Sequence, residues 1–185
     1  MKEFKFYFIY VGNAYPHKNL EMLIKVMVLL NKEVKEDVGL AIVSSRGVFT
    51  KRLEAVVCRL SADSYIRLLG FVPDEDLTKL YRASVAFVFP SFSEGFGLPG
   101  LEAMRAGTLV LTSDIPVFKE IYKENAIYFN PFDIVAIKEA MRTVLGMDTA
   151  CRAKLIAKSQ VFIKRYSWRK MAQETLKVYE DSVGI

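Results

Sequence analysis

Short apolar runs alternate with segments of helical period along almost the whole chain, and this alternation is the feature that most constrains the fold. The apolar runs are residues 5–11, 38–43, 65–69, 84–89, 108–112 and 126–129. Apolar residues recur at helical spacing in residues 19–32, 49–60, 73–83, 98–106, 115–123, 132–146, 149–165 and 168–182. Continuously apolar strands separated by helices are typical of a parallel sheet with helices on both faces. The sequence therefore predicts one α/β domain over residues 1–185, with a doubly wound parallel sheet of about six strands.

Residues with capping chemistry mark the ends of several predicted helices. Asn19 and Ser167 are expected to be N-caps, and Gly107 is expected to follow a helix as its C′ residue. Cys58 and Cys151 lie in helical segments, and we expect both to be free thiols in a reducing compartment.

The composition excludes several classes of protein. Hydrophobic residues make up 52% of the chain and the mean hydropathy is +0.19, which is too apolar for a disordered chain. No apolar run reaches the roughly 18 residues of a membrane-spanning helix. Residues 1–11 are too short and too aromatic for a signal peptide.

The net charge of +5 favours an anionic partner. Nucleic acid is not expected, because the sequence has neither zinc-finger spacing nor dense Lys/Arg runs with interleaved aromatic residues. The longest basic cluster runs from Lys164 to Lys170. It is interpreted as a solvated helix face, with peripheral contact to an anionic membrane surface as the alternative.

Ligands on a parallel sheet bind at the carboxyl ends of its strands. In the loop after the first strand, Gly12 lets a ligand approach the backbone, and Lys18 lies beside a helix N-terminus whose free N–H groups favour an anion. The spacing of a Walker A loop is absent. An ordinary turn with a surface lysine is the alternative, and His17, the one histidine of the sequence, is expected to be a capping or surface residue.

A second loop carries the acidic residues Asp74, Glu75 and Asp76. The Asp-x-Asp pair could hold a divalent metal on a nucleotide diphosphate. Apolar residues follow at helical spacing, however, and the helix dipole favours acidic residues in a first turn. We therefore expect these residues to begin a helix and predict no metal site.

The loop after the fourth strand is the most informative. Gly95, Gly97 and Gly100 fit the pattern G-x-G-x-x-G, but a dinucleotide fingerprint should directly follow its strand, normally the first strand of the sheet. Glu94 would also face the pyrophosphate, which like-charge repulsion disfavours. A nucleotide sugar fits better, because a glycine backbone can lie flat against a ligand and the following helix N-terminus offers N–H groups to a phosphate.

Glu94 and Glu102 complete this interpretation, since carboxylates can accept hydrogen bonds from the hydroxyls of a sugar and of a ribose. Taken singly, Glu102 could be a solvated helix residue, Phe96 a core residue and Gly97 a helix-start turn. Their combination on one loop favours ligand binding.

Residues 93–104 resemble the Glu-x7-Glu signature of the retaining family 4 glycosyltransferases, with Glu94 and Glu102 as the two glutamates. Other segments agree in order and spacing, so the resemblance covers nearly the whole chain. These segments are residues 10–12, 17–20, 70–72, 80–84, 106–108, 113–116 and 167–168.

The resemblance implies a Rossmann-like domain that forms the C-terminal half of a GT-B hexosyltransferase, with a mannosyl- or glucosyltransferase as the suggested activity. In the family, Lys18 would hold the donor diphosphate and, with Glu94, be the catalytic pair. Glu102 would bind the ribose. The remaining donor-binding positions would be Gly12, the backbone near Val72 for the base, and the amides of Gly95, Phe96, Gly97 and Leu98.

The resemblance also implies a mechanism. The sugar would be transferred from a nucleotide-diphosphate donor with retention of configuration and without a metal or other cofactor, while the protein stabilises the leaving diphosphate. Two departures stand out. Asn13 occupies a position where many members carry a second phosphate-binding arginine, and residues 44–47 form a loop where relatives often have more glycine. Arg46 in this loop could substitute as a cation.

A GT-B enzyme also needs an N-terminal domain with the acceptor site, in cis or on a partner subunit. The helix at residues 166–185 is expected to reach towards that domain, and the chain alone is expected to be inactive. The acceptor would be a saccharide or a lipid-linked saccharide, which would place the enzyme in the cytoplasm, at the inner membrane face. Two alternatives are a non-catalytic nucleotide-binding or partner-docking module and a sugar-nucleotide epimerase.

Overall fold

A six-stranded parallel sheet forms the centre of the molecule in a computed structural model that describes residues 4–35, 37–45 and 47–184. The strand order is β3-β2-β1-β4-β5-β6, and every neighbouring pair is parallel. The strands are β1 (Phe6–Val11), β2 (Val38–Val43), β3 (Ile66–Gly70), β4 (Phe87–Phe89), β5 (Val110–Ser113) and β6 (Ile127–Phe129). The predicted fold class is confirmed.

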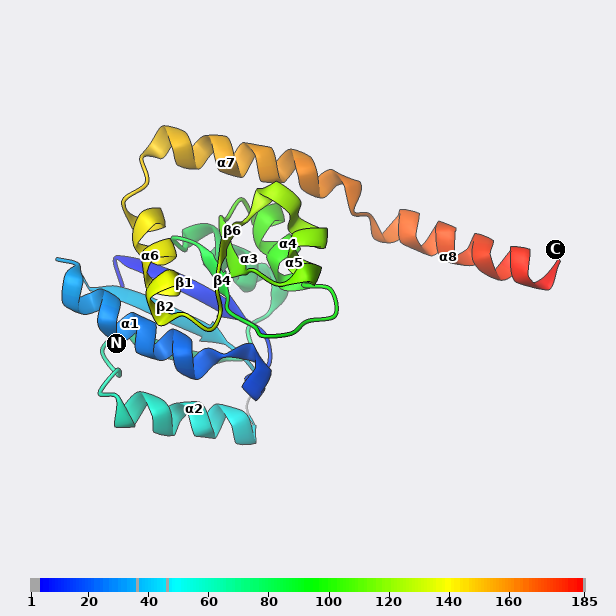
Figure 1. Cartoon of the computed structure of the whole chain (residues 1–185). Helices are drawn as coiled ribbons and strands as arrows, with labels where there is room; N and C mark the ends of the chain where they lie inside the picture. Colours follow the sequence, from blue (N-terminus) through cyan, green and yellow to red (C-terminus); the bar gives the residue numbers. More distant parts are fainter. Residues whose placement is uncertain (1–3, 36, 46, 185) are drawn as a thin grey trace.

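Helices cover both faces of this sheet (Figure 1). The α-helices are α1 (Leu20–Glu33), α2 (Val48–Arg59), α3 (Asp74–Ala83), α4 (Leu98–Ala106), α5 (Pro116–Tyr122), α6 (Ile134–Leu145), α7 (Thr149–Phe162) and α8 (Trp168–Val183). Short 3-10 helices are η1 (Pro16–Lys18), η2 (Lys123–Asn125) and η3 (Ile163–Arg165). Helix α1 packs against α2 and α6, whereas α4 packs against α3 and α7 on the opposite face.

The predicted element boundaries agree with the structure to within a few residues. The largest difference is β4, which begins at Phe87 although the apolar run begins at Ser84. Residues 85 and 86 still hydrogen bond to β1, through the Val85 N–H to Tyr7 and the Ala86 carbonyl to Ile9. The predicted helix at 149–165 is divided into α7 and η3.

Two of the three predicted caps are confirmed. The Ser167 hydroxyl accepts a hydrogen bond from the Lys170 N–H, and Gly107 ends α4 with a φ of 82°. Asn19 lies at the N-cap position of α1, but its side chain does not cap that helix, because the residue adopts a left-handed conformation with φ of 58°. Both cysteines are exposed free thiols, as expected.

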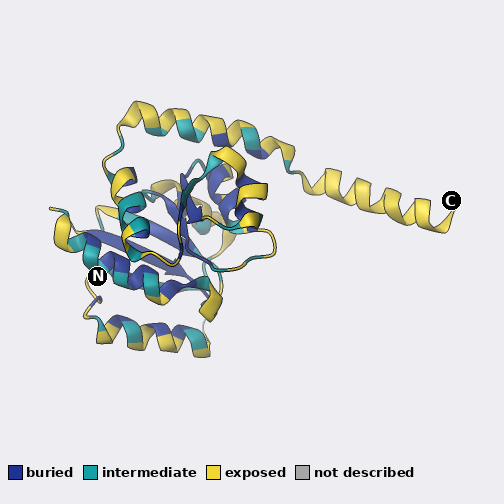
Figure 2. Ribbon diagram, in the orientation of Figure 1, coloured by how far each residue is buried: buried dark blue, intermediate teal, exposed yellow. Residues whose placement is uncertain are grey.

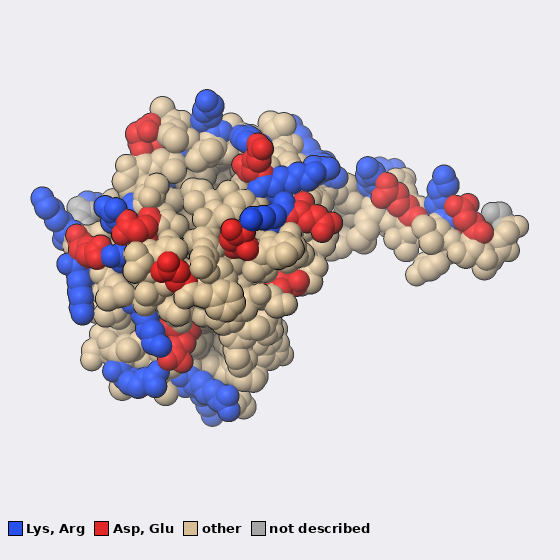
Figure 3. All heavy atoms as spheres, viewed as in Figure 1, with Lys and Arg blue, Asp and Glu red and all other residues tan. Residues whose placement is uncertain are grey.

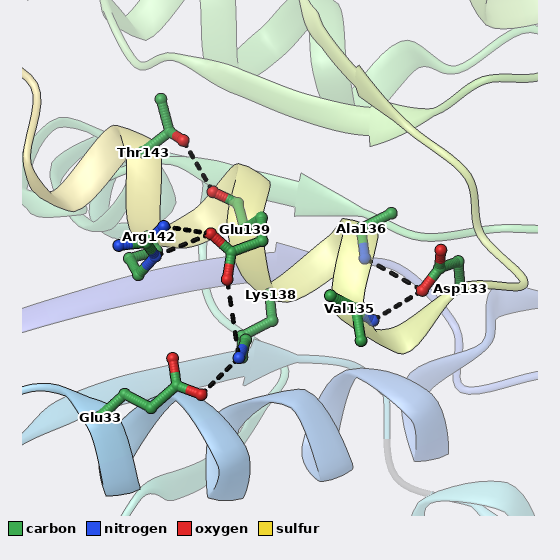
Figure 4. A network of polar contacts seen from close by, with 8 residues as sticks. All are labelled: Glu33, Asp133, Val135, Ala136, Lys138, Glu139, Arg142 and Thr143. Atoms are coloured by element: carbon green, nitrogen blue, oxygen red, sulfur yellow. Dashed lines mark hydrogen bonds and ion pairs between the residues drawn. The ribbon is translucent and has the colours of Figure 1, made fainter.

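Helix α6 makes polar contacts at its N-terminus and in its middle (Figure 4). The Asp133 carboxylate accepts hydrogen bonds from the N–H groups of Val135 and Ala136, at 2.8 and 3.1 Å. One turn further along, Lys138 forms an ion pair with Glu33 at the end of α1. The carboxylate thus caps the N-terminus of α6, and the ion pair joins α6 to α1.

Helix α8 differs from the rest of the molecule. The strands are largely buried, and β2 is buried along its whole length, whereas α8 has no buried residue and extends away from the sheet (Figure 2). Its exposed apolar side chains include Trp168, Met171, Leu176, Tyr179 and Val183. Basic and acidic side chains alternate on the visible face of α8 and of the domain (Figure 3). In the described residues, no helix is long and apolar enough to cross a membrane.

Removal of α8 should therefore have little effect on folding. We predict that a chain ending at Ser167 loses less than about 1 kcal/mol of unfolding free energy, since no buried side chain is removed. The matched comparison is Met141→Ala in α6, whose side chain is fully buried and whose truncation should cost about 2–5 kcal/mol. Urea denaturation measures both. A truncation as costly as Met141→Ala would contradict this description of α8.

Candidate functional site

The candidate site lies where the strand order reverses. Strand β1 has β2 on one side and β4 on the other, so the chain leaves these central strands in opposite directions. In open α/β sheets, this reversal creates a crevice at the carboxyl ends of the strands, and ligands bind there. The loops after β1 and β4 lie at this edge of the sheet.

Hydrogen bonds hold three of the loops at this edge together. The Phe92 N–H, after β4, donates to the His17 carbonyl after β1, at 2.8 Å. The Asn19 side-chain amide, also after β1, donates to the Pro131 carbonyl after β6, at 2.9 Å. Asn19 therefore links two loops instead of capping its own helix.

Lys18 and Glu94, both predicted as site residues, form an ion pair with each other. The Lys18 Nζ lies 2.5 Å from the Glu94 Oε1, and the two side chains are only 15% and 10% exposed. The Ser91 hydroxyl donates to the same carboxylate oxygen at 2.7 Å. The ammonium also lies 5.5 Å from the centre of the Phe89 ring. A cation and an anion of the site are thus held close together but remain within reach of solvent.

The glycine loop between Glu94 and α4 presents free N–H groups. In the part of the chain that the structure describes, the N–H groups of residues 95–98 donate to no other group. They lie at and just before the N-terminus of α4, where Gly97 occupies the N-cap position. Unpaired N–H groups at a helix N-terminus attract anions. This loop can therefore bind a phosphate beside Lys18.

The glycines of the two loops have different roles. A side chain at Gly95 would meet nothing within 4 Å, so the space beside this backbone is open. A side chain at Gly97 or Gly100 would instead overlap the Tyr122 side chain inside the protein. Gly12 has a φ of 144°, and a Cβ there would lie 3.0 Å from the Tyr10 hydroxyl. These three glycines thus make room for buried tyrosines.

Glu102 occupies a separate environment on α4. It lines an apolar pocket of about 310 Å³ between α4, η3 and the start of α8, together with Phe96, Leu98, Arg105, Tyr166 and Trp168. It also borders a second pocket, between α3 and α4, with Asp74 and Tyr81. Partial burial and, next, the negative charge of Asp74 raise the pKa of the Glu102 carboxyl above its usual value, while a hydrogen bond from Tyr81 lowers it.

The other residues singled out in the sequence lie as follows in the structure. Val72 is half-buried after β3. His17 is exposed and stacks on Tyr15 with ring centres 5.9 Å apart, as expected for a surface residue. The Asn13 side-chain oxygen accepts a hydrogen bond from Ser45 at 3.1 Å. Arg46, the suggested substitute cation, lies outside the described residues.

The acidic residues at Asp74–Asp76 form the first turn of α3, as the sequence analysis expected. Asp76 pairs with Lys79, one turn later, at 2.8 Å. Among the described residues there is no group of three or more His, Cys, Asp or Glu side chains that could hold a metal ion.

The comparisons with known proteins identify the family. The family model of glycosyl transferases group 1 matches residues 2–162, and the chain belongs to this family. It is 35% identical over 174 residues to O-antigen chain mannosyltransferase B of Escherichia coli, covering 94% of this chain and 45% of that protein. It is also 35% identical to O-antigen chain mannosyltransferase RfbU of Salmonella typhimurium, over 93% of this chain and 46% of that protein. The chain therefore spans slightly less than half the length of these relatives.

Solved structures share the fold. Sucrose-phosphate synthase from Thermosynechococcus elongatus superposes with a TM-score of 0.86 at 24% identity, over 97% of this chain and 46% of that one. A structure titled trehalose-6-phosphate from E. coli bound with UDP-2-fluoro glucose gives a TM-score of 0.79 at 16% identity. Together with the family match, these likenesses confirm the predicted Rossmann-like, C-terminal GT-B domain.

The environment of Glu102 predicts a dependence of stability on pH. A carboxyl whose pKa is higher in the folded than in the unfolded state destabilises the fold once it is ionised. Its cost is absent below its unfolded value, near 4.5, and grows as the pH rises through the folded value. We predict that Glu102→Gln raises the melting temperature at pH 7 and that this gain disappears below about pH 4.5. Glu120→Gln, at an exposed position of α5, controls for the loss of one negative charge. An equal gain at both pH values would contradict the assignment.

Proposed function

We propose that this chain binds the nucleotide-sugar donor of a hexosyltransferase, and that mannose is the first sugar to test. The observation that carries the proposal is the Lys18–Glu94 pair beside the free N–H groups of residues 95–98. Cationic and N–H donors suit a diphosphate, and a neighbouring carboxylate suits sugar hydroxyls. The family membership and the mannosyltransferase names of two relatives support the same activity.

In the proposed complex, the donor diphosphate takes the Lys18 ammonium away from Glu94. Phosphate oxygens would then accept hydrogen bonds from Lys18 and from the N–H groups of residues 95–98. Glu94, still held by Ser91, would be free to accept hydrogen bonds from the sugar. Binding the donor would thus convert an internal ion pair into two contacts with the ligand.

The same groups would catalyse the transfer. As the bond between the sugar and the diphosphate breaks, negative charge grows on the leaving diphosphate and positive charge grows on the sugar ring. Lys18 and the loop N–H groups would stabilise the first charge, and Glu94 the second. We propose no requirement for a metal ion, because these groups would neutralise the leaving group themselves. We propose retention of configuration from the resemblance of residues 93–104 to the signature of the retaining family.

Glu102 and the loop after β3 would bind the nucleoside. The Glu102 carboxylate would accept hydrogen bonds from the ribose, and the backbone near Val72 would contact the base. The position of Glu102 supports this role, because its exposed carboxylate borders two pockets and can accept hydrogen bonds from the hydroxyls of a ligand.

A complete enzyme would need a second domain. We propose that an N-terminal GT-B domain, in cis or on a partner subunit, brings the saccharide or lipid-linked acceptor, and that the exposed apolar side chains of α8 pack against it. Transfer would occur in the cytoplasm, at the membrane face when the acceptor is a lipid. The described chain alone should bind the donor without useful transfer, because an open half-site leaves the reacting groups in water.

Calorimetry on three forms of the chain tests the donor site. Titration with UDP, GDP and ADP, in EDTA and then with magnesium or manganese, should identify one nucleotide that binds without metal. Glu102→Ala should weaken it roughly ten-fold or more, because a hydrogen bond to a charged group is lost. Lys18→Ala should also weaken it, and the remaining affinity should depend less on salt.

Lys79→Ala is the matched control for Lys18, since it removes an exposed lysine paired with Asp76 on α3. Unchanged affinity in Lys18→Ala and Glu102→Ala would favour a docking module over a donor site. A large gain with metal would refute the metal-independent mechanism.

A further inference from the structure

Tyr122, the last residue of α5, lies directly beneath the glycine loop. The side chain is fully buried, and its hydroxyl donates a hydrogen bond to the Gly97 carbonyl at 2.5 Å. The Gly100 N–H donates to the same Gly97 carbonyl, at 3.1 Å. Because Gly97 and Gly100 have no side chains, the loop backbone rests on the tyrosine with nothing between them.

The position of Tyr122 is fixed by a column of buried aromatic rings. The Tyr122 ring stacks on Phe118 with ring centres 5.3 Å apart, and Phe118 lies 4.9 Å from Phe89 of β4. Lys18 lies over the far end of this column, 5.5 Å from the Phe89 ring. Burial raises the pKa of Tyr122, so its hydroxyl stays protonated and remains a donor.

The glycine loop needs such a support. Residues 90–97 form neither helix nor strand, and Gly97 has a φ of 100°. Glycine has more backbone freedom than other residues, so a loop built on it does not fix the direction of its own N–H groups. Donors that are oriented before the ligand arrives bind an anion better than donors that must first be ordered.

We propose that Tyr122 is a positioning residue for the phosphate-binding loop: its hydroxyl fixes the Gly97 peptide and thereby orients the N–H groups of Phe96, Gly97 and Leu98 towards a diphosphate. The role of these N–H groups rests on the proposed function. Tyr122 itself is enclosed in the protein and makes no contact with the ligand.

The test compares Tyr122→Phe with Tyr128→Phe. Both variants remove a tyrosine hydroxyl that donates to a backbone carbonyl. The Tyr128 hydroxyl, however, donates to Lys123 and Phe118 and not to the glycine loop. Calorimetry measures how both variants bind two ligands: the nucleoside diphosphate that binds most tightly to the unaltered chain, and its nucleoside. Hydrogen exchange is measured in a peptide covering residues 92–101.

We expect Tyr122→Phe to bind the diphosphate roughly three- to ten-fold more weakly and the nucleoside unchanged, because one hydrogen bond that orders the phosphate donors is lost. Exchange in residues 92–101 should accelerate in this variant and not in Tyr128→Phe. A merely structural role would weaken both ligands equally, or neither, and would overturn the proposal.

Failure of the proposed function gives a different result. If the unaltered chain binds no nucleoside diphosphate, the donor-site assignment is wrong, and hydrogen exchange alone decides whether Tyr122 orders the loop. Should Tyr122→Phe be too unstable for calorimetry, its loop exchange is compared with that of residues 110–113 in β5. Faster exchange confined to the loop supports the proposal, whereas equal acceleration in both segments contradicts it.

Discussion

The ion pair between Lys18 and Glu94 is the interaction on which the organisation of the site depends. It joins the loop after β1 to the loop after β4, at the point where the strand order reverses. Ser91 orients the carboxylate, and Phe89 lies below the ammonium. Neighbouring hydrogen bonds from Phe92 and Asn19 connect the same region to the loops after β1 and β6. The ion pair and these hydrogen bonds thus connect the loops after β1, β4 and β6 at the carboxyl edge of the sheet.

A pair in this position contributes little net stability. Partial burial removes water from both charges, and the attraction between them must offset that loss. Two well-packed apolar side chains in place of Lys18 and Glu94 would give the fold a similar stability. Under the proposed function, a ligand would take over each partner, which would account for a charged pair at this position. Glu102 is the second carboxylate of the predicted site, and desolvation and the charge of Asp74 raise its pKa.

Much of the fold could be predicted from local sequence patterns. The strands were visible as apolar runs, and Asp74–Asp76 marked the start of α3 by their charge alone. Asn19 was misjudged, because its amide bonds to Pro131, a residue 112 positions away, and no local pattern reports such a partner. Loop chemistry and the family resemblance both indicated Lys18 and Glu94 as site residues, but not their mutual contact across 76 positions. Tyr122 was missed for a similar reason: nothing in residues 115–123 signals that a hydroxyl there meets the glycine loop.

The exchange of ion-pair partners is tested most directly by Glu94→Gln, alone and combined with Lys18→Met. If a diphosphate must take Lys18 from Glu94, the single variant should bind the free nucleoside diphosphate more tightly, because the competing carboxylate is gone. It should also lose any preference for the intact nucleotide sugar. In the Lys18→Met background, Glu94→Gln should increase the affinity for the diphosphate less than it does in the unaltered chain. The difference between these two changes in binding free energy is the coupling energy between Lys18 and Glu94. Calorimetry that shows weaker binding of both ligands by the same factor in Glu94→Gln would contradict the account.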